Sequence, residues 1–319
     1  MTSDTRTAIL IAAYNAEATL ERAVMSALAQ PEAAEVCIVD DASFDATLAR
    51  GQALAARDGR VKVLSLPANA GPSAARNAAI AATVSPWLAV LDADDYLLDG
   101  RLAALHARAE KADFIADALI RTTTGVAPDW AGGELTTAPL DFRAFVLGNL
   151  GGAGALDLGY MKPLMRRAFL DEHSVHYAPA MRLGEDYELY ARALALGARF
   201  LVCGAAGYVS VERAGSLSKD HDEADLRRLR DCDDAIAALR PLSSSEARAL
   251  DRHWTSVNRR LQWRRLISAV KARNAGMALS TFTSLDATIY LLGKLAEQLW
   301  LRGTGRGPTR TRLSTSAAH

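Results

Sequence analysis

Three carboxylates, Asp92, Asp94 and Asp95, follow directly after the apolar run Trp87–Leu91. Such a run is typical of a buried strand, so the acids would be held rigidly where a sheet ends. Carboxylate oxygens in that place suit a hard divalent cation, which often shares its ligands with substrate phosphates. Capping of a helix near Asp99–Arg101 would explain an isolated acidic triplet, but the preceding strand favours metal or nucleotide binding.

Three other polar clusters also follow apolar runs, at Tyr14–Asn15, Asp40–Asp41 and Asn69–Gly71. Asp40–Asp41 could accept hydrogen bonds from a nucleobase N–H or a ribose hydroxyl, or it could cap the helix expected from Asp45. Tyr14 could stack on a base or pack at the sheet edge. The pattern leaves each pair of alternatives open.

Two more candidates lie on expected helices. Gly71 permits an unusual backbone conformation and Pro72 suits a first helical turn, so Arg76 would lie one turn into a helix. There it could meet a base or a phosphate, or form a surface salt bridge. Glu185 and Asp186 open another helix, where acids favour the macrodipole; a second acid facing a cleft would be a candidate general base.

The elements that must position these residues alternate regularly over the first hundred residues. Continuous apolar runs, each followed by a segment with helical spacing, predict a parallel sheet covered on both faces. Ligands in such sheets lie at the carboxyl ends of the strands, so the four polar clusters are expected to converge on one rim. The expected strands are 8–13, 36–39, 61–66 and 87–91, and the expected helices are 17–29, 45–57 and 72–83.

The pattern loosens after Arg101. We expect a helix over 101–111, a strand over 112–120, irregular chain over 122–139, a helix over 185–196, and strands at 200–202 and 208–211. Residues from 222 read as helices, ending in a Gly/Arg/Thr tail from Gly303 that is expected to be disordered. The expected domains are 1–220, divided at residue 100 into nucleotide-binding and acceptor-binding halves, and a helical extension over 221–302.

Composition limits the class of protein. The 319 residues are half hydrophobic, which suits a large core, and 37 basic residues balance 37 acidic ones. Whole-chain charge therefore gives no support to nucleic-acid binding. Three scattered cysteines form neither a disulfide framework nor a zinc pattern, and the first residues lack the pattern of a secretory signal. We expect a cytoplasmic protein.

The C-terminal third contains a helical region that is rich in basic and apolar residues. A basic helix with tryptophan can lie on an anionic membrane surface. It could equally be a packed helix with a solvated basic face, or a contact in a homodimer. The residues concerned are Arg252, His253, Arg259, Arg260, Arg264, Arg265, Lys271 and Arg273, with Trp254, Leu261, Trp263, Leu266 and Ile267.

These motifs together resemble the family 2, GT-A fold glycosyltransferases in order and spacing. Glu185–Asp186 is similar to the family's "ED" motif, and the stretch from Tyr208 is similar to a loop that closes over the donor diphosphate. The resemblance covers about residues 7 to 220. Segments Gly159–Pro163, Arg166–Leu170 and Gly197–Phe200 further resemble the glucosyltransferases of succinoglycan-type exopolysaccharide synthesis. The motif segments are Ala13–Asn15, Val39–Thr47, Asn69–Asn77, Leu91–Asp95 and Gly184–Asp186.

The resemblance implies a role for each matching position. Asp41, with Asp40, would read uracil, and Tyr14–Asn15 and Arg76 would lie beside the uridine. Asp94 and Asp95 would serve ribose and metal, Mn²⁺ or Mg²⁺, with Asp92 supporting this Asp-x-Asp motif. Asp186 would be the base, with Glu185 beside it. The loop residues expected at the diphosphate are Arg213, Ser216 and Ser218.

The implied reaction is an inverting transfer of a single hexose, glucose from UDP-glucose, to a glycan hydroxyl on a lipid-linked acceptor. Two departures matter: Ala13 replaces the family's usual proline, and the Gln-x-x-Arg-Trp motif of processive synthases is missing.

A nucleotidyltransferase is a rival function, but the glycine-rich basic loop of such enzymes does not follow the first strand. A non-catalytic nucleotide-sugar binding module is another, and the Glu185–Asp186 pair argues against it.

Overall fold

The structure is a computed structural model that describes residues 4–127, 135–151, 158–212 and 222–303. Two compact units divide the chain, Met1–Ser256 and Val257–His319. The first unit therefore extends beyond the domain boundary expected at residue 220. The tail from residue 304 lies outside the described residues. None of the described helices combines the length and the apolar content that crossing a bilayer requires.

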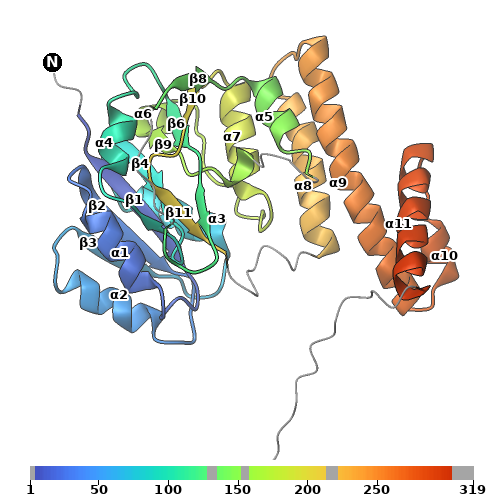
Figure 1. Ribbon diagram of the computed structural model, residues 1–319, viewed down its shortest axis with the longest axis horizontal. Coiled ribbons are helices and arrows are strands. Elements are labelled where there is room, and N and C mark those ends of the chain that lie inside the picture. The colour runs from blue at the N-terminus through green and yellow to red at the C-terminus, as the bar shows by residue number, and fades with distance from the viewer. Residues whose placement is uncertain (1–3, 128–134, 152–157, 213–221, 304–319) are drawn as a thin grey trace, which may run out of the picture. The chain divides into compact units, whose positions relative to one another are not determined.

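A mixed sheet forms the centre of the first unit (Figure 1). Among the described residues, eight strands form it in the order β3-β2-β1-β4-β9-β6-β10-β8, and three more form a small sheet in the order β5-β11-β7. The strands β3, β2, β1 and β4 are parallel, whereas β9 runs antiparallel to both β4 and β6. The strands are β1 (Thr7–Ala13), β2 (Ala33–Asp40), β3 (Val61–Ser65), β4 (Trp87–Val90), β5 (Tyr96–Leu97), β6 (Phe114–Asp117), β7 (Ile120–Thr122), β8 (Thr137–Pro139), β9 (Leu164–Arg166), β10 (Phe200–Cys203) and β11 (Tyr208–Val211).

Helices cover both faces of this sheet (Figure 1). In α1, the buried Leu20, Ala23, Val24 and Ala27 follow helical spacing and face the sheet. The expected strand–helix alternation of the first hundred residues is confirmed. The helices of the first unit are α1 (Leu20–Leu28), α2 (Thr47–Ala55), α3 (Pro72–Ala81), α4 (Arg101–His106), α5 (Phe142–Gly148), the 3-10 helix η1 (Leu158–Tyr160), α6 (Arg167–Glu172), α7 (Glu185–Ala195), α8 (Glu223–Ala237) and the first half of α9 (Ser244–Lys271).

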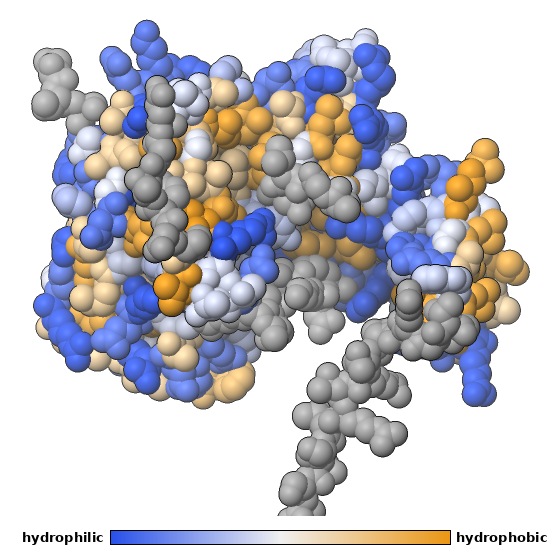
Figure 2. Space-filling model, viewed as in Figure 1, coloured by the Kyte–Doolittle hydropathy of each residue, from blue (hydrophilic) through white to orange (hydrophobic). Residues whose placement is uncertain are grey.

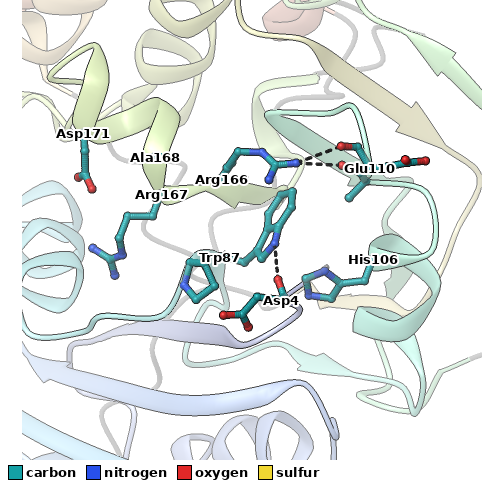
Figure 3. A pocket seen from close by; sticks show the side chains of 10 residues that line it. Asp4, Trp87, His106, Glu110, Arg166, Arg167, Ala168 and Asp171 are labelled. Atoms are coloured by element: carbon teal, nitrogen blue, oxygen red, sulfur yellow. Dashed lines mark hydrogen bonds between the residues drawn. The ribbon is translucent and has the colours of Figure 1, made fainter. Parts of the chain in front are cut away.

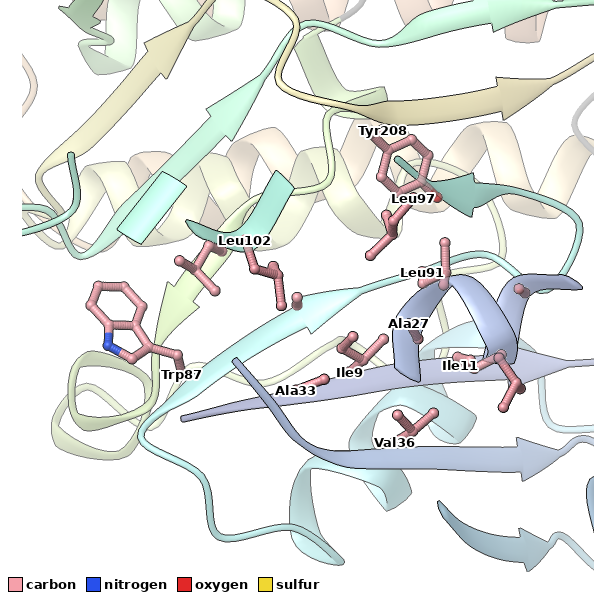
Figure 4. Close-up of a cluster of buried hydrophobic side chains, with 14 of the residues drawn as sticks. Ile9, Ile11, Ala27, Ala33, Val36, Trp87, Leu91, Leu97, Leu102 and Tyr208 are labelled. Atoms are coloured by element: carbon pink, nitrogen blue, oxygen red, sulfur yellow. The ribbon is translucent and has the colours of Figure 1, made fainter. Parts of the chain in front are cut away.

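The main core lies between the sheet and the helices α1, α2 and α4 (Figure 4). Ile9 and Ile11 of β1 face this cluster because alternate residues of a strand point to the same side. Trp87 and Leu91 enter it from the two ends of the fourth strand, and Tyr208 enters from the small sheet. This core therefore holds in place both β4, which precedes the acidic loop, and β11, which carries Tyr208.

The second unit contains the end of α9, the short α10 (Ala275–Leu279) and α11 (Leu285–Gly303). Arg259 on α9 forms an ion pair with Asp286 on α11 and lies over the ring of Tyr290. Val257, Leu261, Ala287 and Leu291 are buried. The unit is thus a helical hairpin with its own small apolar interior.

Candidate active site

The carboxyl ends of β1 and β2 meet the loop before α3, as the sequence predicts. The amide of Asp41 donates to the carbonyl of Ala13 (2.8 Å). The Asp41 carboxylate accepts from the amides of Ala70 (2.7 Å) and Gly71 (2.8 Å). Asp41 therefore holds the loop in place through both of its oxygens.

Asp40 is the better placed of the two acids to accept from a ligand. Its side chain is buried, and Oδ2 accepts from the amide of Ser43 (3.2 Å). Within the part of the chain that the structure describes, Oδ1 of Asp40 has no hydrogen-bond partner. A buried acceptor without a donor is costly, so this oxygen suits a ligand N–H or O–H.

Tyr14 and Asn15 shape the same rim. Asn15 has a positive φ of 49°, which asparagine tolerates, and its side chain accepts from the amide of Phe44 (3.1 Å). Tyr14 meets Phe44 edge to face, with ring centroids 6.1 Å apart. Phe44 is 84% exposed, so this aromatic pair offers a partly open surface beside Asp40.

The acidic loop after β4 is tied to β11. Asp95 is buried and accepts from the Tyr208 hydroxyl (2.9 Å) and the Val211 amide (2.8 Å). The same hydroxyl accepts from the amide of Asp92 (3.1 Å). Burial and the nearby Asp92 charge raise the pKa of Asp95 to about 7, against the lowering effect of the Val211 hydrogen bond. The folded protein therefore disfavours the charged form of Asp95.

A buried ion cluster joins this loop to α3 and α7. Arg76 lies 2.9 Å from Asp92, 3.0 Å from Glu185 and 3.1 Å from Asp186. Lys162 lies 2.7 Å from Asp186 and 3.1 Å from Asp92. The structure thus brings the "ED" pair of α7 to the acidic loop, and it places Arg76 between them rather than alone at the rim.

Glycines position the helices that carry this cluster. Gly71 precedes α3 with φ 87°, and Gly184 precedes α7 with φ 70°. Both are left-handed conformations that favour glycine. They turn the chain so that Arg76 and Asp186 project from neighbouring helices into one cluster.

Lys162 is a site residue that the sequence reasoning missed. It lies two residues before the three-residue strand β9 and is 5% exposed. Burial would lower the pKa of its ammonium, but Asp186 and Asp92 outweigh this and raise it. Burial would likewise raise the pKa of Asp92, but Lys162 and Arg76 lower it to about 2. A buried lysine with two carboxylate partners had no sequence signal beyond its place in a resembling segment.

The acids after β4 were expected to hold a divalent cation. Across the described ranges, no three His, Cys, Asp or Glu side chains lie close enough to hold an ion by themselves. Magnesium can be held by one or two carboxylates together with water and substrate phosphates, so this finding is compatible with the expected roles of Asp94 and Asp95. Burial and the Asp92 charge disfavour the ionised form of Asp95, and a bound cation would favour it.

The predicted diphosphate-binding residues are not described, and the described cavity lies away from the acids. Arg213, Ser216 and Ser218 lie outside the described residues. A cavity of about 350 Å³ opens at the amino end of β4, lined by residues such as Trp87, His106 and Arg166 (Figure 3). Because the acidic loop follows the carboxyl end of the same strand, this cavity is not the site of the acids.

Comparison with known sequences gives a consistent result. The family model described as "Glycosyl transferase family 2" matches residues 8–172. The chain is 43% identical over 276 residues to the succinoglycan biosynthesis protein ExoU of Rhizobium meliloti (strain 1021), covering 85% of this chain and 80% of that protein. It is 40% identical over 238 residues to ExoO of the same organism, covering 69% and 67%.

Solved structures share the fold. S. aureus TarS 1–349 in complex with UDP-GlcNAc aligns with a TM-score of 0.63 at 18% identity, covering 86% of this chain and 90% of that one. The mannosyltransferase PcManGT from Pyrobaculum calidifontis, in complex with GDP-Man and Mn²⁺, aligns with a TM-score of 0.56 at 16% identity, covering 92% and 87%. The expected mostly parallel sheet with flanking helices is confirmed.

Proposed function

Since this chain belongs to glycosyl transferase family 2 and has the GT-A fold of its glycosyltransferases, we propose that it transfers a single hexose from a UDP-sugar to a glycan hydroxyl, with inversion. One observation carries the proposal: the "ED" pair of α7 and the acidic loop of β4 share one buried ion cluster through Arg76 and Lys162. A donor sugar bound at the loop would then lie beside a carboxylate. Glucose is the expected hexose, from the resemblance to succinoglycan-type glucosyltransferases and the similarity to ExoU.

The uridine would bind at the carboxyl ends of β1 and β2. The buried Oδ1 of Asp40, which has no hydrogen-bond partner among the described residues, would accept from the uracil N–H, and Tyr14 would lie against the base. Asp41 would keep the adjoining loop in shape rather than contact the base through a free oxygen. Asn15 would hold the turn on which Tyr14 lies.

The diphosphate would lie at the acidic loop. Asp94 and Asp95 would hold Mn²⁺ or Mg²⁺, which when bound supplies positive charge to the departing diphosphate. Tyr208 and Val211 keep the Asp95 carboxylate in position. Arg213, Ser216 and Ser218 would close over the diphosphate, a role that rests on the resemblance alone.

Asp186 would take the proton from the acceptor hydroxyl as that oxygen attacks the anomeric carbon. Its two oxygens already accept from Arg76 (3.1 Å) and Lys162 (2.7 Å). The acceptor hydroxyl must therefore reach a remaining lone pair or displace one of these donors. Glu185 also accepts a hydrogen bond from Arg76 and would help to hold it in place.

The acceptor would be a growing, lipid-linked exopolysaccharide or cell-surface glycan. The similarity to two succinoglycan biosynthesis proteins supports this class of product. The enzyme would then work at the inner face of the cytoplasmic membrane, with its basic C-terminal helices near anionic lipid. A homodimer through those helices is the competing role.

A screen of UDP-sugars tests the proposal. Purified protein is incubated with UDP-glucose, UDP-galactose and UDP-GlcNAc, with manganese or with EDTA, and UDP release is measured. We expect release from one UDP-hexose that EDTA abolishes. Pyrophosphate release from a sugar phosphate and UTP would instead identify a nucleotidyltransferase, and binding of UDP-sugars without turnover would identify a binding module.

A further inference from the structure

The neutral net charge of this protein conceals a strong asymmetry between its two units. Residues 257–319 contain eleven Lys and Arg but only two Asp and Glu, whereas residues 1–256 contain 26 and 35. The helical unit is therefore strongly basic, and the unit with the active site is acidic. A basic surface of this kind attracts anionic partners.

Among the described apolar residues of α9 in the second unit, Val270 is 62% exposed, and one such residue does not form a face for lipid. Leu261, Leu266 and Ala269 are buried in the hairpin, and Trp263 is half-buried. Basic residues on the same helix, such as Arg264 and Lys271, are exposed. In the second unit α9 therefore matches the alternative stated above, a packed helix with a solvated basic face.

The exposed apolar face belongs to α11 instead. Leu285, Ile289, Leu292 and Leu299 are 78%, 64%, 55% and 70% exposed. Their spacing of four, three and seven residues places them in one stripe along the helix, while Ala287 and Leu291 on the other side are buried. Figure 2 shows hydrophobic residues gathered around this helix. Such a stripe is typical of an interaction surface.

We propose that the apolar face of α11 docks into the interface of an anionic membrane, with the basic residues of its unit against the lipid headgroups. Charge favours this occupant over a second copy of the chain, because two strongly basic units would repel each other. The apolar stripe favours lipid over nucleic acid, which is bound mainly through its phosphates.

This inference deepens the membrane part of the proposed function, and it does not depend on the transfer chemistry. Docking would confine the enzyme to the surface that carries its lipid-linked acceptor. The encounter with the acceptor then gains from a raised effective concentration. Activity on a water-soluble acceptor would not need the docked helix.

Flotation of the full chain tests the proposal, with vesicles of phosphatidylglycerol and phosphatidylcholine or of phosphatidylcholine alone. We expect the protein to float with the anionic vesicles only. Ile289→Glu/Leu292→Glu should lower the bound fraction at least about tenfold, and Arg264→Gln/Lys271→Gln should lower it less and make it less sensitive to salt. The matched control, Met25→Glu/Val84→Glu, alters two exposed apolar residues of the first unit and should float normally.

Each other outcome overturns the proposal. Protein that stays at the bottom with anionic vesicles, or Ile289→Glu/Leu292→Glu that floats as well as the parent, would exclude the α11 face. Equal flotation with neutral vesicles would exclude the anionic headgroup. A dimer in light scattering that this variant dissociates, without flotation, would assign the face to a second copy. UDP release is measured on the same samples, so loss of transfer and loss of flotation are told apart.

Discussion

The ammonium of Lys162 lies 2.7 Å from one carboxylate oxygen of Asp186, and both side chains are buried. Lys162 also lies 3.1 Å from Asp92, so one cation links the acidic loop of β4 to the first turn of α7. Arg76 makes the same link from α3. These two cations therefore tie the loop proposed to bind the donor to the carboxylate proposed to accept the proton.

Lys162→Met should lower kcat at least about tenfold, because Asp186 would lose a partner that fixes its position. The pKa of Asp92, which Lys162 now helps to lower, should rise, so the acidic limb of the pH profile of kcat/KM should move to higher pH. Lys162→Arg keeps the charge and should restore part of the rate. Circular dichroism checks the fold. An unchanged kcat and pH profile in folded Lys162→Met would exclude this role.

Asp186→Asn should lower kcat at least about a hundredfold, within the usual contribution of a general base. UDP affinity, measured by calorimetry with manganese, should change little because the proposed uridine contacts lie at the ends of β1 and β2 and not on α7. Glu188→Gln is the matched control: Glu188 lies on the same helix, is also buried, and pairs with Arg192 at 2.7 Å. Near-normal turnover of Asp186→Asn, or an equal loss in Glu188→Gln, would remove Asp186 from the mechanism.

Asp94→Asn and Asp95→Asn should both weaken manganese-dependent UDP binding about tenfold or more, because each removes a proposed metal ligand. Asp95→Asn should also lower stability, since Asp95 accepts from Tyr208 and Val211. Tyr208→Phe separates the effects: it should cost about 1–3 kcal/mol of stability, and it should weaken UDP binding less than either aspartate variant because both carboxylates remain. Calorimetry with and without manganese, beside thermal unfolding, measures both. Unaltered affinity in both aspartate variants would refute the assignment.

The first hundred residues could be interpreted from sequence because their order is local. Each strand there is a continuous apolar run followed by a helix, so β1 to β4 and their rim follow from periodicity and the rules for parallel sheets. The convergence of Asp41 with Ala70 and Gly71 required no knowledge of distant segments.

What the sequence did not reveal depends on long-range pairing. The strand β9 has three residues and is defined by its antiparallel partners β4 and β6, so no periodicity marks it. Lys162, which precedes it, was missed for the same reason. The resemblance places Arg76 beside the uridine, but its ion pairs with Glu185 and Asp186, over a hundred residues away, follow only from the fold. The folded loop alone also decides that Asp40, rather than Asp41, keeps a carboxylate oxygen without a hydrogen-bond partner among the described residues.

His106 should make the protein sensitive to mild acid. Its imidazole lies 2.8 Å from the Thr7 hydroxyl and meets Trp87 edge to face; burial, with the charge of Arg166, lowers its pKa to about 4. The unfolded state takes up its proton near pH 6.5, so this stability is full above 6.5 and is lost as pH falls toward 4. We expect a loss on the order of 1–2 kcal/mol, allowing for partial exposure.

His106→Gln should remove this contribution, which is measured as the difference in the pH slope of urea unfolding between parent and variant from pH 6.5 to 4. The difference is needed because Asp95, with its pKa raised to about 7, adds a slope of opposite sign to both proteins. The Glu35 carboxylate provides a contrast, because its partners Lys62 and Ser85 outweigh burial and lower its pKa to about 2. Its contribution is lost only as pH falls from about 4.5 toward 2. An unaltered slope between pH 6.5 and 4 in His106→Gln would assign the acid sensitivity to other groups.

Substitution of Gly184 should lower both the stability of the protein and its turnover. Its φ is 70°, and a Cβ there would lie 2.6 Å from a methyl carbon of Leu229. Gly184→Ala should therefore cost about 1–3 kcal/mol from backbone strain, and more from displacing Leu229. Because Gly184 begins α7, kcat should fall as Asp186 moves. Gly100→Ala is the matched control, since Gly100 has φ 78° before α4 and nothing within 4 Å of its Cβ position; it should show the backbone cost alone, with normal kcat. Equal losses of stability and equal turnover in the two variants would show that the contact with Leu229 does not position the base.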